Sequence, residues 1–250
     1  MQSAMLTTSR KTLLLERLAR DGQLAVTPLA QEFGVSEDTL RRDLRDLAAE
    51  GKLIRVHGGA VPASQTHQPV AVRRNVHGTE KRRLAQAAAR LIHDDAIVIV
   101  DGGTTHGELA QALPHSRRCT IVTHSPAIAA SFEFHEQVQI VMIGGRIFRH
   151  SMVAVGAGAA EAFGRINADL CLLGVTGIHP ELGLTTGDSE EAAVKRIMMK
   201  AAAETVVLAT PDKIGHASAW QIADLSQIST LVTIGARPEW LLPSADHISA

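Results

Sequence analysis

A loop of five residues has the clearest chemical potential in the sequence. Asp101-Gly102-Gly103-Thr104-Thr105 follows an apolar run and precedes a segment with helical periodicity. The glycines allow a tight turn and a close ligand approach, and backbone N–H groups with threonine hydroxyls at a helix start can bind an anion. The sequence contains neither the GK[ST] ending of a Walker loop nor a GxGxxG fingerprint. The loop therefore predicts a phosphate site or, as the simpler alternative, only a tight turn.

Two further loops follow apolar strands and contain small or polar residues. Thr123, His124 and Ser125 end one strand, and Gly144 and Gly145 end another. Loops at the carboxyl ends of parallel strands are where α/β folds bind ligands. These five residues are therefore candidate ligand contacts.

A predicted helix that begins at Ser36 suits nucleic acid instead. Its outward face has Thr39, Arg41, Arg42 and Arg45. Arginine can form two hydrogen bonds to a guanine edge, and hydroxyl groups can bind bases or phosphates. The alternative is a solvated face on which the arginines pair with acidic residues of the same helix.

A predicted hairpin follows this helix and adds polar side chains. Lys52, Arg55 and His57 lie beside Gly58-Gly59, whose backbone can closely approach a phosphate chain. A helix for the major groove and a hairpin on the phosphates together indicate a winged helix-turn-helix.

Hydrophobic periodicity predicts the elements that position these side chains. Thr27, followed by Pro28, and Ser36 are the expected N-caps, because Ser and Thr accept hydrogen bonds from the first free N–H groups of a helix. Gly34-Val35-Ser36 joins two helices, as in a helix-turn-helix. The expected elements are helices over about 9–20, 27–34 and 36–51 and a hairpin over 52–62.

The rest of the chain alternates strands and helices after a polar segment. This order predicts an α/β domain with a mainly parallel sheet, and strands that are apolar on both faces predict that helices cover it on both sides. The apolar strands are expected at 96–100, 121–123, 138–143, 170–173, 206–208 and 231–234. We expect a winged helix-turn-helix over 1–62, a linker over 63–78 and a ligand-sensing domain over 79–250.

Composition and charge narrow the class of protein. The chain has 250 residues, is 45% hydrophobic and 20% charged, and lacks Tyr. Scarce aromatics argue against a single-strand binder that stacks bases. Residues 1–90 contain 15 basic and 9 acidic residues, a net +6, and residues 91–250 contain 10 and 17, a net −7. This split favours a polyanion-binding part joined to something else, although residues 1–60 alone are only +1.

Cysteine usage and hydropathy favour the cytoplasm. Cys119 and Cys171 lie in apolar stretches, where we expect buried thiols, and no CxxC occurs. No secretory signal and no run of the roughly 18 apolar residues that a membrane span needs is found. The histidines and cysteines lack metal-ligand spacing, so neither a metal nor a cofactor is expected.

The N-terminal segment resembles the DNA-binding domain of the DeoR family of bacterial transcriptional regulators. The resemblance covers residues 10–61 and rests on the run 35–44, then Leu47, Gly51, Arg55 and His57-Gly58-Gly59-Ala60. It implies that Asp43 holds an arginine by an ion pair. The candidate DNA contacts are Ser36, Thr39, Arg41, Arg42, Arg45, Arg55, His57 and Gly58.

The C-terminal segment, to about residue 235, resembles the sensor domain of the same family, which is related to ribose-phosphate isomerases and CoA transferases. The resemblance implies a repressor of carbohydrate catabolism that responds to a phosphorylated sugar or related metabolite. The candidate effector contacts are Asp101, Gly102, Gly103, Thr104, Thr105, Thr123, His124, Ser125, Gly144, Gly145, Gly177, Glu191, Lys195 and Lys213.

The sequence departs from the family pattern at three places. His124 stands where Asn is common, His106 follows the Gly-Thr-Thr loop, and Thr210-Pro211-Asp212-Lys213 replaces Asp-Ser-Ser-Lys. The two histidines indicate either an unusual effector or only local hydrogen bonds.

Two other functions remain as alternatives. One is a sugar-phosphate isomerase fused to a DNA-binding domain, but residues 173–178 lack the paired aspartates of the related isomerases. The other is a DNA-binding scaffold with an inactive sensor. We prefer a regulator without catalytic turnover, which binds double-stranded operator DNA as a homodimer or homotetramer.

Overall fold

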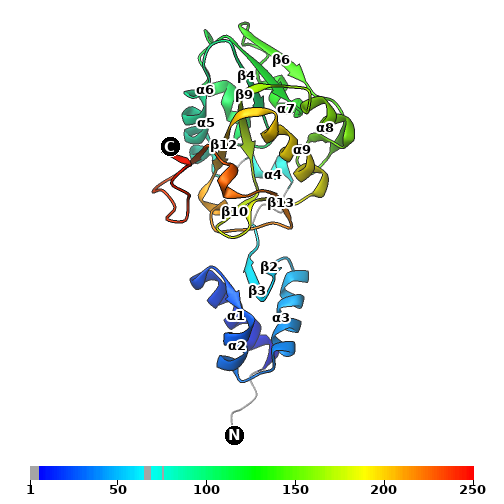
Figure 1. Cartoon of the computed structure of the whole chain (residues 1–250), viewed down its shortest axis with the longest axis vertical. Coiled ribbons are helices and arrows are strands. Elements are labelled where there is room, and N and C mark those ends of the chain that lie inside the picture. Colours follow the sequence, from blue (N-terminus) through cyan, green and yellow to red (C-terminus); the bar gives the residue numbers. More distant parts are fainter. Residues whose placement is uncertain (1–5, 65–68, 75) are drawn as a thin grey trace.

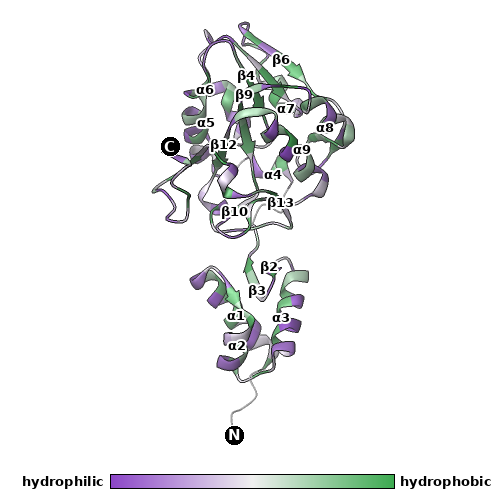
Figure 2. Cartoon of the chain, in the orientation of Figure 1, coloured by the Kyte–Doolittle hydropathy of each residue, from purple (hydrophilic) through white to green (hydrophobic). Residues whose placement is uncertain are grey.

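The chain folds into a winged helix at its N-terminal end and a larger α/β domain at the other end (Figure 1). The computed structural model describes residues 6–64, 69–74 and 76–250. Hydrophobic residues gather in the central strands, and the outer faces of the N-terminal helices are hydrophilic (Figure 2). None of the helices in these ranges is long and apolar enough to cross a membrane.

Three helices and a small sheet form the winged helix. Leu14, Leu18, Leu40, Leu44 and Leu47 are each at most 3% exposed and form its core, as their spacing predicts. The sheet has the order β1-β3-β2 and is antiparallel. The elements are α1 (Thr7–Asp21), β1 (Leu24–Ala25), α2 (Val26–Phe33), α3 (Glu37–Ala49), β2 (Leu53–Val56) and β3 (Gly59–Pro62).

One of the two predicted N-caps is confirmed and the other is wrong. Ser36 caps α3, because its Oγ accepts a hydrogen bond from the Thr39 N–H at 3.2 Å. Thr27 lies inside α2, and its hydroxyl donates to Glu37 Oε1 at 2.7 Å. The chain enters α2 from β1, and the Val26 N–H donates to the Gly58 carbonyl at 2.8 Å. This tertiary bond starts the helix one residue before the predicted cap.

A seven-stranded parallel sheet is the centre of the second domain, which confirms the predicted fold class. Its order is β15-β14-β12-β9-β4-β5-β6. Side chains alternate between two hydrophobic cores, as Ile99 and Val100 do in neighbouring positions. The strands are β4 (Ala96–Val100), β5 (Cys119–Thr123), β6 (Val138–Met142), β9 (Ala168–Gly174), β12 (Ala202–Ala209), β14 (Thr230–Thr233) and β15 (Asp246–Ser249).

Helices cover both faces of this sheet. Residues of α8 and α9 contribute to one core, and residues of α5, α6 and α7 contribute to the other. These helices are α5 (Gly78–Ala89), α6 (Leu109–Ala112), α7 (Pro126–Ser131), α8 (Ala157–Phe163) and α9 (Ser189–Lys200), with 3-10 turns η1 (His106–Glu108), η2 (Pro211–Lys213) and η3 (Leu225–Gln227). Cys119 and Cys171 are buried free thiols, as expected, and burial raises the pKa of Cys119 to about 11.

Two small antiparallel sheets complete the domain. Strands β10 (Gly177–His179), β11 (Gly183–Thr186) and β13 (Trp220–Ala223) form one, and β7 (Arg146–Phe148) and β8 (Val153–Val155) form the other. Apolar runs alone do not predict these short strands.

The segment between the two domains contacts the α/β domain directly. Ala63 forms a β-bridge with Ala217, and the Ser64 N–H donates to the Ala217 carbonyl at 2.7 Å. A short helix, α4 (Val70–Arg73), lies in the range expected to be a linker, and its Val70 N–H donates to the His150 carbonyl at 2.8 Å. Residues 65–68 and 75 of that expected linker lie outside the described residues.

Candidate functional site

The loop after β4 forms one wall of a pocket at the carboxyl edge of the parallel sheet. Gly102 is required there, because a Cβ atom would lie 2.2 Å from Val153 Cγ1. The backbone N–H groups of Gly103, Thr104 and Thr105 find no acceptor within the described part of the chain. This wall therefore presents several unsatisfied donors to whatever enters the pocket.

Asp101 lies beneath this wall and is fully buried. Its Oδ1 accepts from the Gly102 N–H at 2.7 Å and lies 3.0 Å from His124 Nε2, and its Oδ2 accepts from the Gly174 N–H at 2.8 Å and from Lys195 Nζ. Burial alone would raise the pKa of Asp101, but the charge of Lys195 and the hydrogen bond from His124 hold it well below its usual range. Asp101 is thus an ionised carboxylate that anchors the loop.

Lys195 connects this anchor to the opposite wall. Its Nζ also donates to the Gly174 carbonyl at 2.9 Å and lies 3.6 Å from Glu191 Oε1, one turn earlier in α9. Burial would lower the pKa of Lys195, but the charges of Asp101 and Glu191 raise it above the usual value. Glu191 Oε2 in turn accepts from Thr186 at 3.1 Å and from Ser151 at 3.4 Å. Glu191 and Lys195, four residues apart on α9, therefore belong to a larger hydrogen-bonded network.

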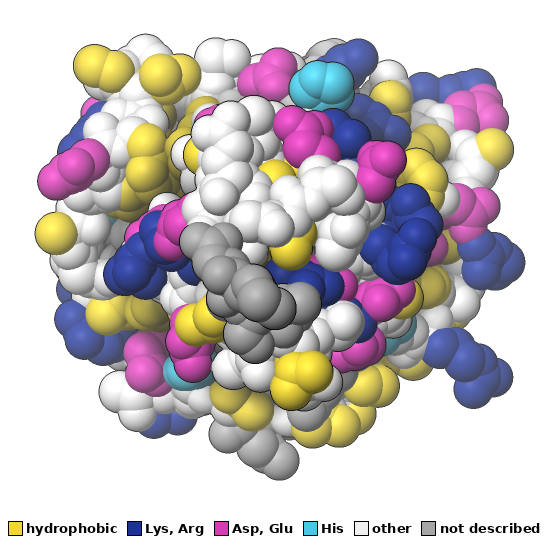
Figure 3. All heavy atoms as spheres, turned by 90° about the horizontal axis from the view of Figure 1, so that it is seen from below, with side chains coloured by type: hydrophobic (Ala, Val, Ile, Leu, Met, Phe, Trp, Pro, Cys, Tyr) yellow, Lys and Arg dark blue, Asp and Glu magenta, His cyan; other side chains and the backbone are white. Residues whose placement is uncertain are grey.

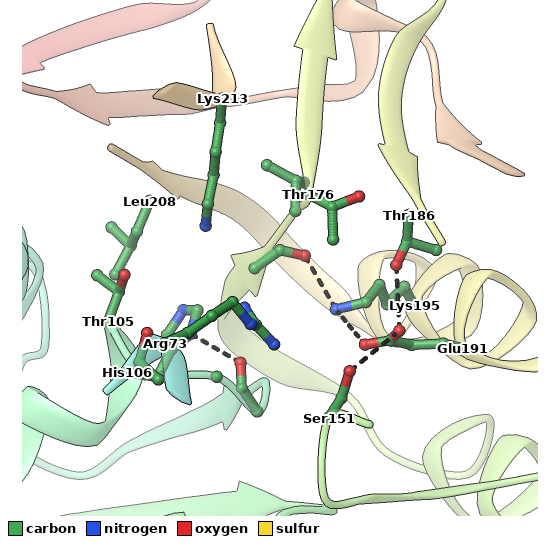
Figure 4. Close-up of a pocket in the computed structure, with 15 residues that line it drawn as sticks. Arg73, Thr105, His106, Ser151, Thr176, Thr186, Glu191, Lys195, Leu208 and Lys213 are labelled. Atoms are coloured by element: carbon green, nitrogen blue, oxygen red, sulfur yellow. Dashed lines mark hydrogen bonds and ion pairs between the residues drawn. The ribbon is translucent and has the colours of Figure 1, made fainter. Parts of the chain in front are cut away.

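Lys213 enters the pocket from η2, and Figure 4 shows its ammonium pointing into the open centre. The side chain is buried, and no described residue accepts a hydrogen bond from it or forms an ion pair with it. Burial lowers its pKa to about 8, the charge of Asp212 opposes this shift, and the charges of Arg73 and Lys195 add to it. A buried ammonium without an anionic partner is costly unless a ligand provides one.

His106 lines the same pocket and has an unsatisfied ring nitrogen. Its Nδ1 lies 3.1 Å from the Gly102 carbonyl, whereas the buried Nε2 has no hydrogen-bond partner in the part of the chain that the structure describes. Burial lowers the pKa of His106 to about 4, and the opposing charge of Asp101 does not offset it. The neutral ring with a proton on Nδ1 leaves Nε2 as an acceptor for a ligand hydroxyl.

The predicted effector residues separate into three groups by position. Those that line the Lys213 pocket are Gly102, Gly103, Thr104, Thr105, Glu191, Lys195 and Lys213. Asp101, Thr123 and His124 are fully buried and lie below the pocket wall. Ser125 lines a neighbouring cavity. Gly144 and Gly145 lie before β7, and Gly177 lies in β10 opposite Thr185, and none of the three lines this pocket.

Several pocket residues were absent from the sequence-based set. They include Arg73, Ser151, Thr176 and Thr186, and also His106, which the sequence marked only as a departure from the family pattern. Arg73 lies in α4, where Lys81 Nζ donates to its carbonyl at 2.5 Å and holds the end of the helix. Its position in a polar segment without periodicity gave no sign of a pocket residue. The available signal was charge, since the net charge rises from +1 over residues 1–60 to +6 over residues 1–90, and Arg73 contributes to this rise.

Two larger cavities adjoin the Lys213 pocket. One has a volume of about 230 Å³ and shares Ser151, Thr176 and Glu191 with it. The other has a volume of about 400 Å³ and shares Gly103, Thr104 and Ser151. The Lys213 pocket itself has a cavity volume of only about 30 Å³.

The outward face of α3 has both paired and unpaired arginines. Arg41 pairs with Glu37 at 2.6 Å and with Asp38 at 3.4 Å. Arg42 and Arg45 are exposed and form no ion pair or hydrogen bond with any described residue. The solvated-face alternative therefore describes Arg41 and not the other two.

The remaining predicted DNA contacts lie around this helix and on the hairpin. Ser36 caps α3 and Thr39 lies in its first turn, with their hydroxyls 2.9 Å apart. Arg55, His57 and Gly58 are exposed at or near the tip of the β2–β3 hairpin. Seen from the winged-helix end, basic side chains alternate with acidic ones over the visible described residues (Figure 3).

Asp43 has the structural role that the sequence suggested. It forms an ion pair with Arg10 of α1, and the two side chains are only 3% and 7% exposed. The ion pair predicted for Asp43 is confirmed, and it fixes α3 against α1.

Both parts of the chain match models of known families. Residues 10–66 match a DeoR-like helix-turn-helix domain, and residues 76–234 match a DeoR C terminal sensor domain. The chain belongs to the DeoR family of transcriptional regulators. The predicted resemblance is confirmed in both domains.

Two relatives that match this DeoR-family chain along nearly their whole length are transcriptional regulators. The transcriptional regulator GlpR of Haloferax volcanii is 34% identical over 92% of this chain and 91% of its own. The transcriptional repressor GlcR of Bacillus subtilis is 32% identical over 90% and 87%. A ribose 5-phosphate isomerase A from Methanocaldococcus jannaschii matches with a TM-score of 0.39 and 16% identity, over 54% of this chain and 53% of that one.

The departures from the DeoR-family pattern have distinct places in the structure. His124 is buried and bonds locally, with Nδ1 2.7 Å from the Ala154 carbonyl and Nε2 on Asp101. His106, in contrast, lines the pocket. Asp212 Oδ1 lies 3.8 Å from His77 Nε2. Pro211 begins η2, the turn that positions Lys213. Among the described residues, no group of His, Cys, Asp and Glu could hold a metal ion.

Proposed function

We propose that this DeoR-family regulator is a repressor of a carbohydrate catabolism operon, and that a phosphorylated sugar in the Lys213 pocket alters its affinity for operator DNA. The observation that carries the proposal is the buried Lys213 ammonium without a partner. A phosphate dianion would satisfy this charge and the free N–H groups of Gly103, Thr104 and Thr105 together. The sugar phosphate, not the protein, would provide the missing counter-charge.

The names of two relatives support a repressor of this kind. One of them is the glycerol-3-phosphate regulon repressor of Escherichia coli K12, which is 26% identical over 92% of each chain. Another is a putative aga operon transcriptional repressor of Escherichia coli O157:H7, at 29% identity. We extend this chemistry to the present chain because its pocket has the positive charge that a phosphate needs.

Catalytic turnover does not suit the carboxylates of this pocket. An isomerase needs a carboxylate base that is free to take a proton from the substrate. Asp101 already has four hydrogen-bond partners and a low pKa, and Glu191 contacts Thr186, Ser151 and Lys195. The pocket therefore suits binding without turnover, and the isomerase alternative predicts turnover that a direct assay would detect.

The DNA side of the proposal requires more than one copy of the chain. Dimeric helix-turn-helix proteins bind two half-sites about one helical turn apart or a multiple of it. We propose a homodimer or homotetramer in which α3 of two copies enters successive major grooves and the hairpins lie on phosphates. This role suits Arg42, Arg45 and Arg55, because their side chains form no ion pair or hydrogen bond with any described residue.

Selection from a random DNA library, followed by binding titrations, tests this function. The selected duplex should be bound, and a panel of sugar phosphates (glucose 6-phosphate, fructose 1-phosphate, fructose 6-phosphate, ribose 5-phosphate and glycerol 3-phosphate) should contain at least one member that changes the affinity. A coupling of about 1–3 kcal/mol corresponds to a change of about 5–150-fold. The unphosphorylated sugars serve as matched controls. Conversion of any panel member at an enzyme-like rate, or no effect of any phosphate, would contradict the proposal.

A further inference from the structure

The Lys213 pocket is much smaller than the two cavities that adjoin it. Its volume is about 30 Å³, whereas the volumes of the other two are about 230 and 400 Å³. The larger part of a sugar phosphate held at Lys213 therefore has most room in one of these two cavities. Which cavity it enters decides which part of the protein senses the sugar.

The cavity of about 230 Å³ lies where the wing meets the α/β domain. Ile54 of β2 lines it from the wing, and Phe148, His150 and Ala219 line it from the sensor. Ile54 pairs with Val61 of β3, close to the end of the hairpin that leads into the α/β domain. Ser151, Thr176 and Glu191 line both this cavity and the Lys213 pocket, so the two cavities adjoin at these three side chains.

The lining of this cavity combines apolar and polar side chains. Ile54, Phe148 and Ala219 provide apolar surface, and Ser151 and Ser218 provide hydroxyl groups. Pockets for small ligands combine apolar and aromatic walls with a few polar groups that fix the ligand. A sugar ring has apolar C–H faces and a rim of hydroxyls, which matches both kinds of wall.

We infer that the sugar part of the effector occupies this wing–sensor cavity and contacts Ile54, so that the wing of the DNA-binding domain is itself part of the effector site. The inference rests on the proposed function, since it starts from a phosphate bound at Lys213. It assigns the phosphate to the Lys213 pocket and the selection of the sugar to the junction of the two domains.

A hydrogen-bonded connection from the shared wall to the wing supports this assignment. Ser64, two residues after β3, donates from Oγ to the Thr176 carbonyl at 2.6 Å. The Ala217 N–H donates to the Pro62 carbonyl at 3.0 Å, which extends β3 onto the sensor. A ligand that contacts both Thr176 and Ile54 therefore has different affinities for two conformations in which the wing and the sensor meet differently. Such differential binding is what a change in operator affinity requires.

The cavity of about 400 Å³ is the competing location. Arg74, Glu108, Ser125 and Ala127 line it, and no wing residue does. A sugar bound there would contact the sensor domain and the segment that precedes it, but not the wing. The two locations predict opposite results when either cavity is filled by a larger side chain.

Cavity-filling variants of the full chain distinguish the two locations. Ile54→Trp fills the junction from the wing, Ala219→Trp fills it from the sensor, and Ala127→Trp fills the competing cavity as the matched control. Each variant is titrated by calorimetry with inorganic phosphate and with the panel member that binds wild type most tightly. The phosphate alone reports on the Lys213 pocket, and the sugar phosphate reports on both parts of the site.

We expect both junction variants to lose at least tenfold in sugar-phosphate affinity while inorganic phosphate binds as to wild type, and Ala127→Trp to keep the wild-type affinity for both. Unchanged sugar-phosphate affinity in Ala219→Trp, or a loss confined to Ala127→Trp, would overturn the inference and leave the proposed function standing. Absence of sugar-phosphate binding to wild type would instead reject the proposed function and this inference with it. The Ala219→Trp variant keeps the test decisive if the substitution in the wing prevents folding.

Discussion

Two buried lysines, at different sides of one pocket, differ in what surrounds their charge. Lys195 donates to Asp101 and to the Gly174 carbonyl, and neighbouring carboxylates raise its pKa. Lys213 has no partner among the described residues, and burial lowers its pKa to about 8. The comparison separates a charge that holds the pocket together from a charge that is available to a ligand. The protein tolerates the second charge at a cost in stability, which an anionic effector would relieve.

The largest effect should come from removing the paired lysine. Lys195→Met leaves the ionised Asp101 buried without its main counter-charge, which costs about 3–5 kcal/mol for a buried ion pair. Urea unfolding of the variant measures this loss, with Lys200→Met on the exposed side of the same helix as the matched control. A loss below about 1 kcal/mol would mean that Lys195 does not hold the pocket together.

Removing the unpaired lysine should have the opposite sign. Because the pKa of Lys213 is about 8 in the folded chain and 10.5 in the unfolded chain, its charged form destabilises the fold at neutral pH, and this penalty decreases from about pH 8 upward and is lost above about pH 10.5. Lys213→Met should stabilise the unliganded protein at pH 7 by about 3 kcal/mol. Urea unfolding at pH 7 and at pH 10 measures the change, which should be smaller at pH 10. A destabilised variant at pH 7 would show that Lys213 has an undetected partner.

The same contrast applies to the arginines of α3. Arg42 has no partner, whereas Arg41 is held by Glu37 and Asp38. Arg42→Ala should weaken specific operator binding by about 1–3 kcal/mol if the side chain reads a base. Arg41→Ala should weaken it less, because binding DNA would first require Arg41 to give up its ion pairs. Fluorescence anisotropy with the selected duplex measures both, and equal wild-type affinities would reject this recognition face.

The most gradual effect is a pH dependence of effector binding. As the pH rises through about 8, Lys213 loses its proton and with it the attraction for phosphate. Affinity for the sugar phosphate should be nearly constant between pH 7 and 8 and should then fall by up to about tenfold per pH unit. Calorimetric titrations across this range test the dependence, and a flat profile up to pH 10 would exclude Lys213 as the phosphate ligand.

Local features of the winged helix were predictable from sequence, because short-range bonds determine them. The cap at Ser36 and the leucine stripe of α3 depend on neighbours within a few residues. Thr27 failed as a cap because a hydrogen bond from Val26 to the hairpin starts α2 earlier. Local patterns do not contain such tertiary bonds.

The candidate site was predictable in part. The loop at 102–105 and Lys213 follow family motifs and do line one pocket. Arg73 was missed because it lies in α4 within an aperiodic polar segment, and Thr176 and Thr186 were missed because short strands of the small sheet place them. The sequence placed Lys195 among the effector contacts but did not reveal its ion pair with Asp101, because the two residues are 94 positions apart.

The most direct test of the account is operator release by Lys213→Met. Wild type and variant are bound to the selected duplex and titrated with the active sugar phosphate and with the same sugar lacking phosphate. The account predicts that only the phosphorylated sugar changes operator binding by wild type, and that neither compound changes it in the variant, which still binds the duplex. A wild-type response of Lys213→Met to the sugar phosphate would contradict the account.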